Sequence, residues 1–126
     1  MKLTNPPTLR NKKRYIVIKI YSKKPLNFFS VKNAIWKSVL DLIGEINAGK
    51  SHLKIYKNLY SAKNQTCFVR CTPKFVDYVK TALSLIHQIG DQRVVFRSVH
   101  TSGTIKSGKK ILSKFLKKSS VTETFL

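Results

Sequence analysis

The chain has 126 residues, of which 42% are hydrophobic, so it is long and apolar enough to form one core without disulfides or a metal. Its 25 Lys and Arg residues against 5 Asp and Glu residues give a formal net charge of +20, which predicts a polyanionic partner: RNA, DNA or an anionic membrane. The sequence contains no apolar run of signal-peptide or membrane-spanning length, and its few, scattered carboxylates disfavour enzymes that need paired acids.

The first predicted element follows a basic arm over residues 1–13, which we expect to be flexible. Residues 15–21 are β-branched and aromatic, which predicts a strand. Alternation along this strand separates its side chains into two faces, with Ile16, Ile18 and Ile20 on one and Tyr15, Val17, Lys19 and Tyr21 on the other.

The next element is a helix, predicted from Ser30 as its N-cap to about residues 42–43. Its apolar arc includes Trp36 and is wider than contact with one sheet requires, so we expect this helix to touch a further element. Gly44 and Gly49 are expected to break the chain after it.

Two strands are then predicted over residues 53–56 and 66–72, and we expect them to form an antiparallel hairpin. The second strand contains Cys67 and Cys71, whose Cα atoms lie about 13 Å apart in an extended chain. A disulfide requires Cα atoms within about 7 Å, so these cysteines cannot bridge each other. We interpret them as small core side chains of an intracellular protein, and no metal site is predicted.

A second helix is predicted after Thr72 as its cap and before Gly90 as its end, followed by a strand over 94–99. A lysine-rich helix to about Lys118 completes the pattern. The order strand–helix–strand–strand–helix–strand predicts an α+β fold: an RRM-like or ferredoxin-like sandwich (βαββαβ, antiparallel sheet) with an extra C-terminal basic helix. We place this domain at residues 14–118 and expect a mobile tail over 119–126.

Residues 44–51, Gly-Glu-Ile-Asn-Ala-Gly-Lys-Ser, match the full Walker A pattern. A phosphate-binding loop of this type follows a strand and precedes a helix, whereas here a predicted helix comes before the match and a strand after it. We therefore interpret the match as a coincidence. A P-loop nucleotide hydrolase, the interpretation we disfavour, would depend on Lys50.

The strand face opposite the isoleucines is aromatic and basic, with Tyr15, Val17, Tyr21, Tyr56, Phe68 and Arg70 in register on the three strands. One interpretation is that bases of RNA stack on these aromatics, as in an RRM. The other is that the C-terminal helix or a partner protein covers them. Because Ile105, Leu112 and Phe115 give that helix an apolar side that needs a contact, we favour a covered face.

The C-terminal helix has Lys106, Lys110 and Lys114 at i, i+4 spacing, with Lys109, Lys117 and Lys118 nearby. Like charges at this spacing destabilise a helix by a few tenths of a kcal/mol per pair, so a phosphate backbone is the expected counter-ion. A membrane surface is the rival partner, but the apolar side lacks the tryptophans expected there. Ser102-Gly103-Thr104 precedes this helix, where Ser102 is expected to cap it and the free N–H groups to bind an anion.

Three short runs, Arg14-Tyr15-Ile16, Arg70-Cys71 and Ser102-Gly103-Thr104-Ile105-Lys106, occur in this element order, with Tyr56 and the apolar helix around 83–86 between them. In these runs and in element spacing from about residue 12 to 117, the sequence resembles the ribonuclease P protein component 2 family of archaea, which has a eukaryotic branch. Its low acidic content is a departure that leaves the partner surfaces open.

The resemblance implies a cytoplasmic protein subunit of ribonuclease P, the ribonucleoprotein that removes 5′ leaders from precursor tRNA. The catalyst would be the RNA subunit with Mg²⁺, and this chain would bind that RNA together with protein component 3 and other subunits. No catalytic residue and no cofactor of its own is expected. The alternative is a ribosomal or free RRM-type RNA-binding protein, which would expose its aromatics to single strands.

We therefore expect two sets of contact residues. RNA contacts are predicted for Arg14, Arg70, Arg97, Ser102, Gly103, Thr104, Lys106, Lys109, Lys110 and Lys114. Protein-partner contacts are predicted for Tyr15, Val17, Trp36, Tyr56 and Phe68.

Overall fold

A computed structural model describes residues 12–124 of the chain. Its elements, in chain order, are β1 (Arg14–Tyr21), α1 (Phe28–Lys50), β2 (Lys54–Ile55), β3 (Thr66–Cys71), the 3₁₀ turn η2 (Pro73–Phe75), α2 (Val76–Leu85), β4 (Gln88–Ile89), β5 (Gln92–Arg93), β6 (Val95–Ser102) and α3 (Ile105–Thr124). The predicted arm over 1–13 lies outside these residues except for its last two.

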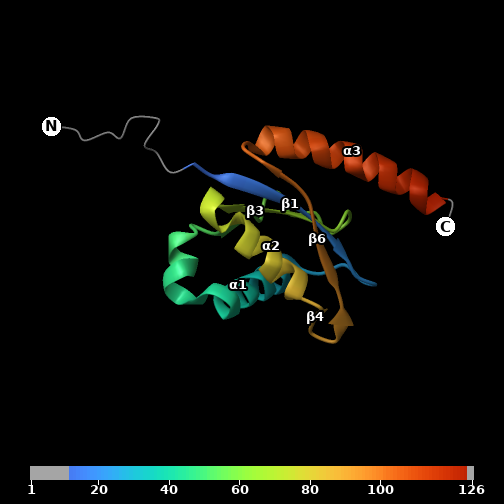
Figure 1. The fold of residues 1–126 in the computed structure, drawn as a ribbon. Helices are drawn as coiled ribbons and strands as arrows, with labels where there is room; N and C mark the ends of the chain where they lie inside the picture. The colour runs from blue at the N-terminus through green and yellow to red at the C-terminus, as the bar shows by residue number, and fades with distance from the viewer. Residues whose placement is uncertain (1–11, 125–126) are drawn as a thin grey trace.

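One antiparallel sheet, with strand order β2-β3-β1-β6, organises the fold. Helices α1 and α2 lie on one side of this sheet and α3 lies across the other (Figure 1). This confirms the predicted α+β sandwich with its extra helix, because both βαβ halves contribute one central and one edge strand. The short β4–β5 hairpin between α2 and β6 was not predicted.

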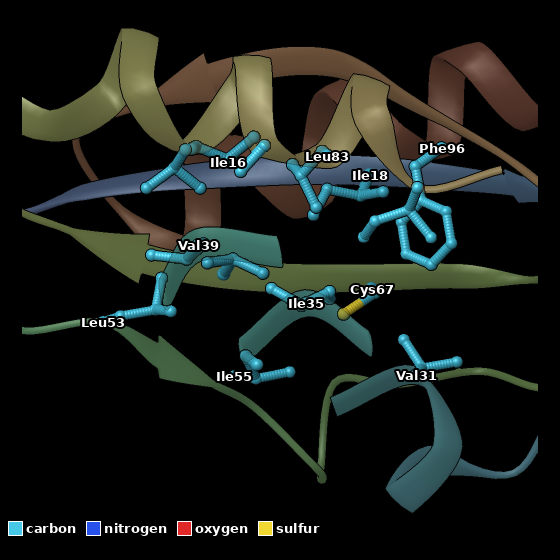
Figure 2. Close-up of a cluster of buried hydrophobic side chains, with 14 of the residues drawn as sticks. Ile16, Ile18, Val31, Ile35, Val39, Leu53, Ile55, Cys67, Leu83 and Phe96 are labelled. Atoms are coloured by element: carbon cyan, nitrogen blue, oxygen red, sulfur yellow. The ribbon is translucent and has the colours of Figure 1, made fainter. Parts of the chain in front are cut away.

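The main core fills the space between the sheet and the two helices α1 and α2. Ile16 and Ile18 of β1 meet Ile35 of α1 and Leu83 of α2, and all four side chains are at most 1% exposed (Figure 2). Each buried side chain of this size contributes about 1.5–3 kcal/mol relative to exposure. The predicted division of β1 into two faces is therefore confirmed on its isoleucine side.

Helix α1 is longer than predicted at both ends. Asn27, not Ser30, is the N-cap, and its side chain accepts a hydrogen bond of 2.8 Å from the Ser30 backbone N–H. Gly44 kinks the helix at φ 80°, as a residue without a Cβ can, but the chain re-enters the helix and continues through Gly49 to Lys50. The expected second contact exists, because α1 packs on α2 and also shares the main core with the sheet.

The second helix also differs at its ends. It begins with the turn η2, where the Thr72 side chain makes no capping hydrogen bond, and α2 ends at Leu85 because Ile86 adopts an extended conformation. Gly90, expected to end this helix, instead lies in the β4–β5 turn with φ 62°, a left-handed conformation that hairpin turns favour for glycine.

The C-terminal helix extends past its predicted end near Lys118, since α3 continues to Thr124. The first residues of the predicted tail over 119–126 are therefore helical.

Cys67 and Cys71 are free and buried in the main core beside Val69, as predicted. Burial raises the pKa of Cys67 to about 12 and that of Cys71 to about 11. Both thiols therefore stay neutral in the folded protein at pH values where unfolded cysteines, with a pKa of about 8.5, ionise. Because the folded state favours the neutral thiols, their burial contributes to stability. This contribution is complete below about pH 8 and is lost as the pH rises toward 11.

We expect iodoacetamide at pH 8.5 to label both cysteines slowly in the native protein and quickly in urea, because only the unfolded chain presents accessible thiolates. Mass spectrometry of the two time courses measures this. Equal rates in both conditions would contradict the buried placement of the two thiols.

Candidate nucleic-acid interface

Helix α3 is held against the sheet by a close contact at Gly108. A Cβ atom on this residue would lie 2.9 Å from Cε2 of Phe68 and 3.2 Å from Cγ2 of Val17. Only a glycine lets the helix backbone approach this closely. Val17 and Phe68 are consequently at most 1% exposed. Of the two interpretations of the aromatic face, coverage by the C-terminal helix is confirmed at these two residues.

The start of α3 is capped by Thr104 and not by Ser102. The Oγ1 of Thr104 accepts a hydrogen bond of 3.1 Å from the Ser107 backbone N–H. Ser102 is buried, and its hydroxyl donates to the Thr104 carbonyl oxygen, so it is unavailable to an external phosphate. Gly103 and Thr104 are exposed. The anion contact stays a prediction for Gly103 and Thr104, and the burial of Ser102 argues against its side chain taking part.

The outer side of α3 is a continuous cationic surface. Between Ile105 and Lys117 the helix has no acidic residue, and all its lysines in that span are exposed. We call this surface the α3 basic face and define it as Lys106, Lys109, Lys110, Lys114 and Lys117. No acidic residue on the same span of the helix offsets the repulsion among these lysines, and this favours binding of an external polyanion.

The three arginines predicted to contact RNA lie in different parts of the fold. Arg97 of β6 is exposed, and its guanidinium is 5.8 Å from the centre of the Phe115 ring on α3, so it adjoins the α3 basic face. Arg70 of β3 lies opposite Tyr15, and its Nε is buried without a hydrogen-bond partner among the described residues. Arg14 is half-buried at the start of β1 and donates to the Lys13 carbonyl oxygen at 3.1 Å.

The residues predicted to meet a protein partner are also separated. Val17 and Phe68 lie inside the chain, beneath α3, and this assignment is corrected because α3 occupies their surface. Trp36 is half-buried on α1 and packs against the main core on the other side of the sheet. Tyr15 and Tyr56 remain half-buried, with ring centres 6.1 Å apart.

Burial, and then the neighbouring Tyr56, raise the pKa of Tyr15. Its hydroxyl therefore stays neutral to a higher pH than that of a free tyrosine, and its side-chain hydrogen bond with Tyr56 contributes to this.

The Walker A match lies in the C-terminal part of α1, from the kink at Gly44 to Ser51 just beyond the helix. A strand, β2, follows it, so the match lacks the strand–loop–helix arrangement of a P-loop, as predicted. Within the described residues no group of three or more His, Cys, Asp or Glu side chains is placed to hold a metal ion. None of the helices described is long and apolar enough to cross a membrane.

Several basic and aromatic residues beside β2 were missed by the sequence analysis, among them Phe29, Lys54 and Lys57. Lys54 and Tyr56 alternate with the buried Ile55. This alternation was the signal that could have placed Lys54 beside Tyr56 on the same face of the sheet as Arg70. No sequence pattern indicated Phe29, because it is on α1 and lies beside β2 only in the folded chain.

Comparison with known proteins adds an independent line of evidence. The model of the Rpp14/Pop5 family matches residues 14–113. Ribonuclease P protein component 2 of Pyrococcus abyssi is 39% identical over 117 residues, covering 91% of this chain and 98% of that protein. The protein of the same name from Methanocaldococcus jannaschii is 38% identical over 108 residues, covering 84% and 76%.

A chain of a solved structure, the cryo-EM structure of yeast ribonuclease MRP, shares the fold. It aligns with a TM-score of 0.58 over 93% of this chain and 98% of that chain, at 9% sequence identity.

Proposed function

Because this chain belongs to the Rpp14/Pop5 family, we propose that it is a protein subunit of ribonuclease P that binds the catalytic RNA of the particle. Relatives that align over most of the chain bear the name ribonuclease P protein component 2. In this proposal the particle removes the 5′ leader of precursor tRNA in the cytoplasm, and the RNA subunit with Mg²⁺ performs the chemistry. The chain itself contributes no catalytic residue.

The observation that supports RNA binding best is the α3 basic face. Five exposed lysines project from one helix, and Arg97 of β6 lies beside them. The four strands of the main sheet contain no acidic residue, so the sheet behind α3 adds no opposing charge. Neutralising phosphates with lysine releases counterions, and this release is the main source of affinity in such interfaces.

Four of the five acidic residues lie elsewhere in the fold, and the fifth, Glu123, is near the end of α3, beyond the α3 basic face. Asp41 and Glu45 are on α1, Asp77 is in the first turn of α2, and Asp91 is in the β4–β5 turn. From this uneven distribution of acidic residues we infer that the α3 side of the molecule faces RNA. We propose that protein component 3 and other subunits bind where the chain is less basic.

We expect this subunit, added with protein component 3 to the ribonuclease P RNA of the same organism, to lower the Mg²⁺ concentration needed for cleavage. Lysines between packed RNA helices replace Mg²⁺ ions that otherwise screen phosphate repulsion. The measurement is 5′-leader removal from precursor tRNA across a Mg²⁺ series, with and without the protein pair.

The purified chain alone is the control, and it should not cleave precursor tRNA at any Mg²⁺ concentration. An unchanged Mg²⁺ requirement in a fully assembled particle would contradict the proposed role. Cleavage by the protein without RNA would contradict the assignment of catalysis to the RNA subunit.

A further inference from the structure

An open groove of about 830 Å³ runs along the sheet edge formed by β2, on the far side of the sheet from β6. We call it the edge groove, and its lining residues are Phe28, Phe29, Lys32, Lys54, Ile55, Tyr56, Lys57 and Asn58. Its volume falls in the range of about 300–1,000 Å³ that ligand sites occupy. The lining combines aromatic rings with three lysines and includes no acidic residue.

The phenylalanine rings of the edge groove are supported by contacts with neighbouring aromatic rings. Phe28 is half-buried and packs on Tyr60, with ring centres 5.8 Å apart, while the Tyr60 hydroxyl donates to the Leu26 carbonyl oxygen. Phe28 in turn meets Phe29 edge-on at 5.8 Å. Phe29 is nevertheless 60% exposed, so more than half of this side chain is accessible to a ligand while Phe28 supports it.

Two of the lysines stand over these rings. The Nζ of Lys57 is 5.2 Å from the centre of the Phe29 ring, and that of Lys54 is 4.9 Å from the centre of the Tyr56 ring. Each pair therefore offers an aromatic surface and a positive charge within the width of one small ligand. A ligand that satisfies both groups must contain a flat ring and an anion close together.

The edge groove continues onto the part of the sheet that α3 leaves open. Helix α3 packs mainly on β6 and β1, at the other end of the strand order. The Tyr56 ring lies 6.1 Å from that of Tyr15, and Lys54 is in register with Arg70, whose buried Nε has no hydrogen-bond partner in residues 12–124. Aromatic and basic groups thus extend from α1 around β2 to the centre of the sheet.

We propose that the edge groove binds unpaired nucleotides of RNA, with bases stacked on Phe29 and Tyr56 and phosphates held by Lys32, Lys54 and Lys57. Single-stranded RNA has the required combination, since every nucleotide joins a flat base to a phosphate. Duplex RNA does not, because its bases are stacked inside the helix. An acidic peptide would pair with the lysines and leave the exposed ring of Phe29 without a contact.

This inference rests on the proposed function and deepens it. The α3 basic face consists of charges alone and has no exposed ring among its defining residues, so it suits the backbone of a duplex. The edge groove adds rings, and it would select a single-stranded segment of the same RNA. The two surfaces lie at opposite ends of the sheet, so they can be tested separately.

The test measures binding of the full-length chain to three probes of equal length at physiological ionic strength: oligouridylate RNA, an abasic oligomer with the same phosphates, and duplex RNA. Fluorescence anisotropy gives each Kd. The wild-type chain should bind oligouridylate more tightly than the abasic oligomer. Phe29→Ala should weaken oligouridylate binding about tenfold and leave abasic binding nearly unchanged, because a stack and no charge is removed.

Two further variants serve as controls for the loss of stacking. Phe29→Trp preserves a stacking surface and should retain the preference for bases, with its fluorescence quenched on binding. Tyr78→Ala removes another exposed aromatic, on α2 and outside the edge groove, and should bind all three probes like the wild type.

Equal affinity of the wild-type chain for oligouridylate and the abasic oligomer would overturn the proposal, as would an unchanged preference in Phe29→Ala. Displacement of oligouridylate by polyglutamate with equal efficiency from the wild type and Phe29→Ala would favour an acidic protein partner and also overturn it. None of these outcomes requires the ribonuclease P assay. Failure of the edge groove is therefore distinguishable from failure of the Mg²⁺ prediction.

Discussion

Phe68→Ala is expected to destabilise the folded chain by about 3–5 kcal/mol, the range for removing a buried aromatic side chain. Phe68 is 1% exposed and lies where the Gly108 backbone of α3 comes closest to the sheet. The truncated side chain would leave a cavity between α3 and β3 that a rigid helix cannot close. Thermal unfolding followed by circular dichroism should show a Tm roughly 10–25 °C lower.

The exposed aromatic Tyr78 supplies the matched control. Tyr78→Ala should cost only about 1 kcal/mol, since its side chain is 53% exposed and the aromatic contact it loses is with Phe75, at 6.0 Å between ring centres. A loss below about 1 kcal/mol in Phe68→Ala would show that α3 does not seal this face of the sheet. The aromatics beneath it would then be accessible, as an RRM-type platform requires.

Sequence alone was sufficient for β1 because its two faces differ in chemistry. Ile16, Ile18 and Ile20 alternate with Tyr15, Val17, Lys19 and Tyr21, and a shift of one residue would remove all three isoleucines from the main core. The same reasoning placed Cys67 and Cys71 on the core face of β3. Patterns of period two are short, local and hard to mistake when one face is entirely aliphatic.

The ends of α1 were not predictable in this way, because contacts from distant residues decide them. Asn27 and Ser30 are both good N-caps, and the anchoring of the Leu26 carbonyl by Tyr60 favours the earlier start. At the other end, the backbone N–H of Thr72 donates to the Ser51 carbonyl oxygen at 2.9 Å. Such contacts have no signature within the helix sequence.

The candidate interface was predicted in composition but only partly in arrangement. The lysines of α3 followed from spacing and charge, which require no tertiary information. The burial of Val17 and Phe68 required knowing where α3 lies, and Gly108 was the overlooked signal. A glycine inside a helix costs about 1 kcal/mol relative to alanine, so its presence among lysines indicates a close backbone contact.

The edge groove illustrates the limit of reasoning along the chain. Phe29 is on α1 and Lys57 follows β2, and the tertiary fold brings the Lys57 Nζ to 5.2 Å from the centre of the Phe29 ring. Neither segment shows a recognisable binding motif by itself. A surface built from two distant segments becomes visible when the topology is known.

Replacing Lys106, Lys109, Lys110 and Lys114 together with alanine is expected to weaken binding to ribonuclease P RNA about a thousandfold at 0.1 M salt. Each phosphate contact contributes about 0.7–0.9 to the slope of log K against log salt, so four lost contacts should flatten that slope by about three. Stability should not fall, because alanine favours helix and the like-charge repulsion disappears. Filter binding over a salt series measures both quantities.

A second quadruple variant separates position from net charge: Lys23, Lys37, Lys63 and Lys74, all exposed and none on α3, are replaced by alanine. It removes the same four charges, so long-range attraction to RNA falls equally in both variants. Direct phosphate contacts are lost only in the α3 variant, and therefore only that variant should flatten the slope by about three. Equal losses of affinity and slope in the two variants would mean that RNA senses only the overall charge of +20, and α3 would then lose its assignment as the binding surface.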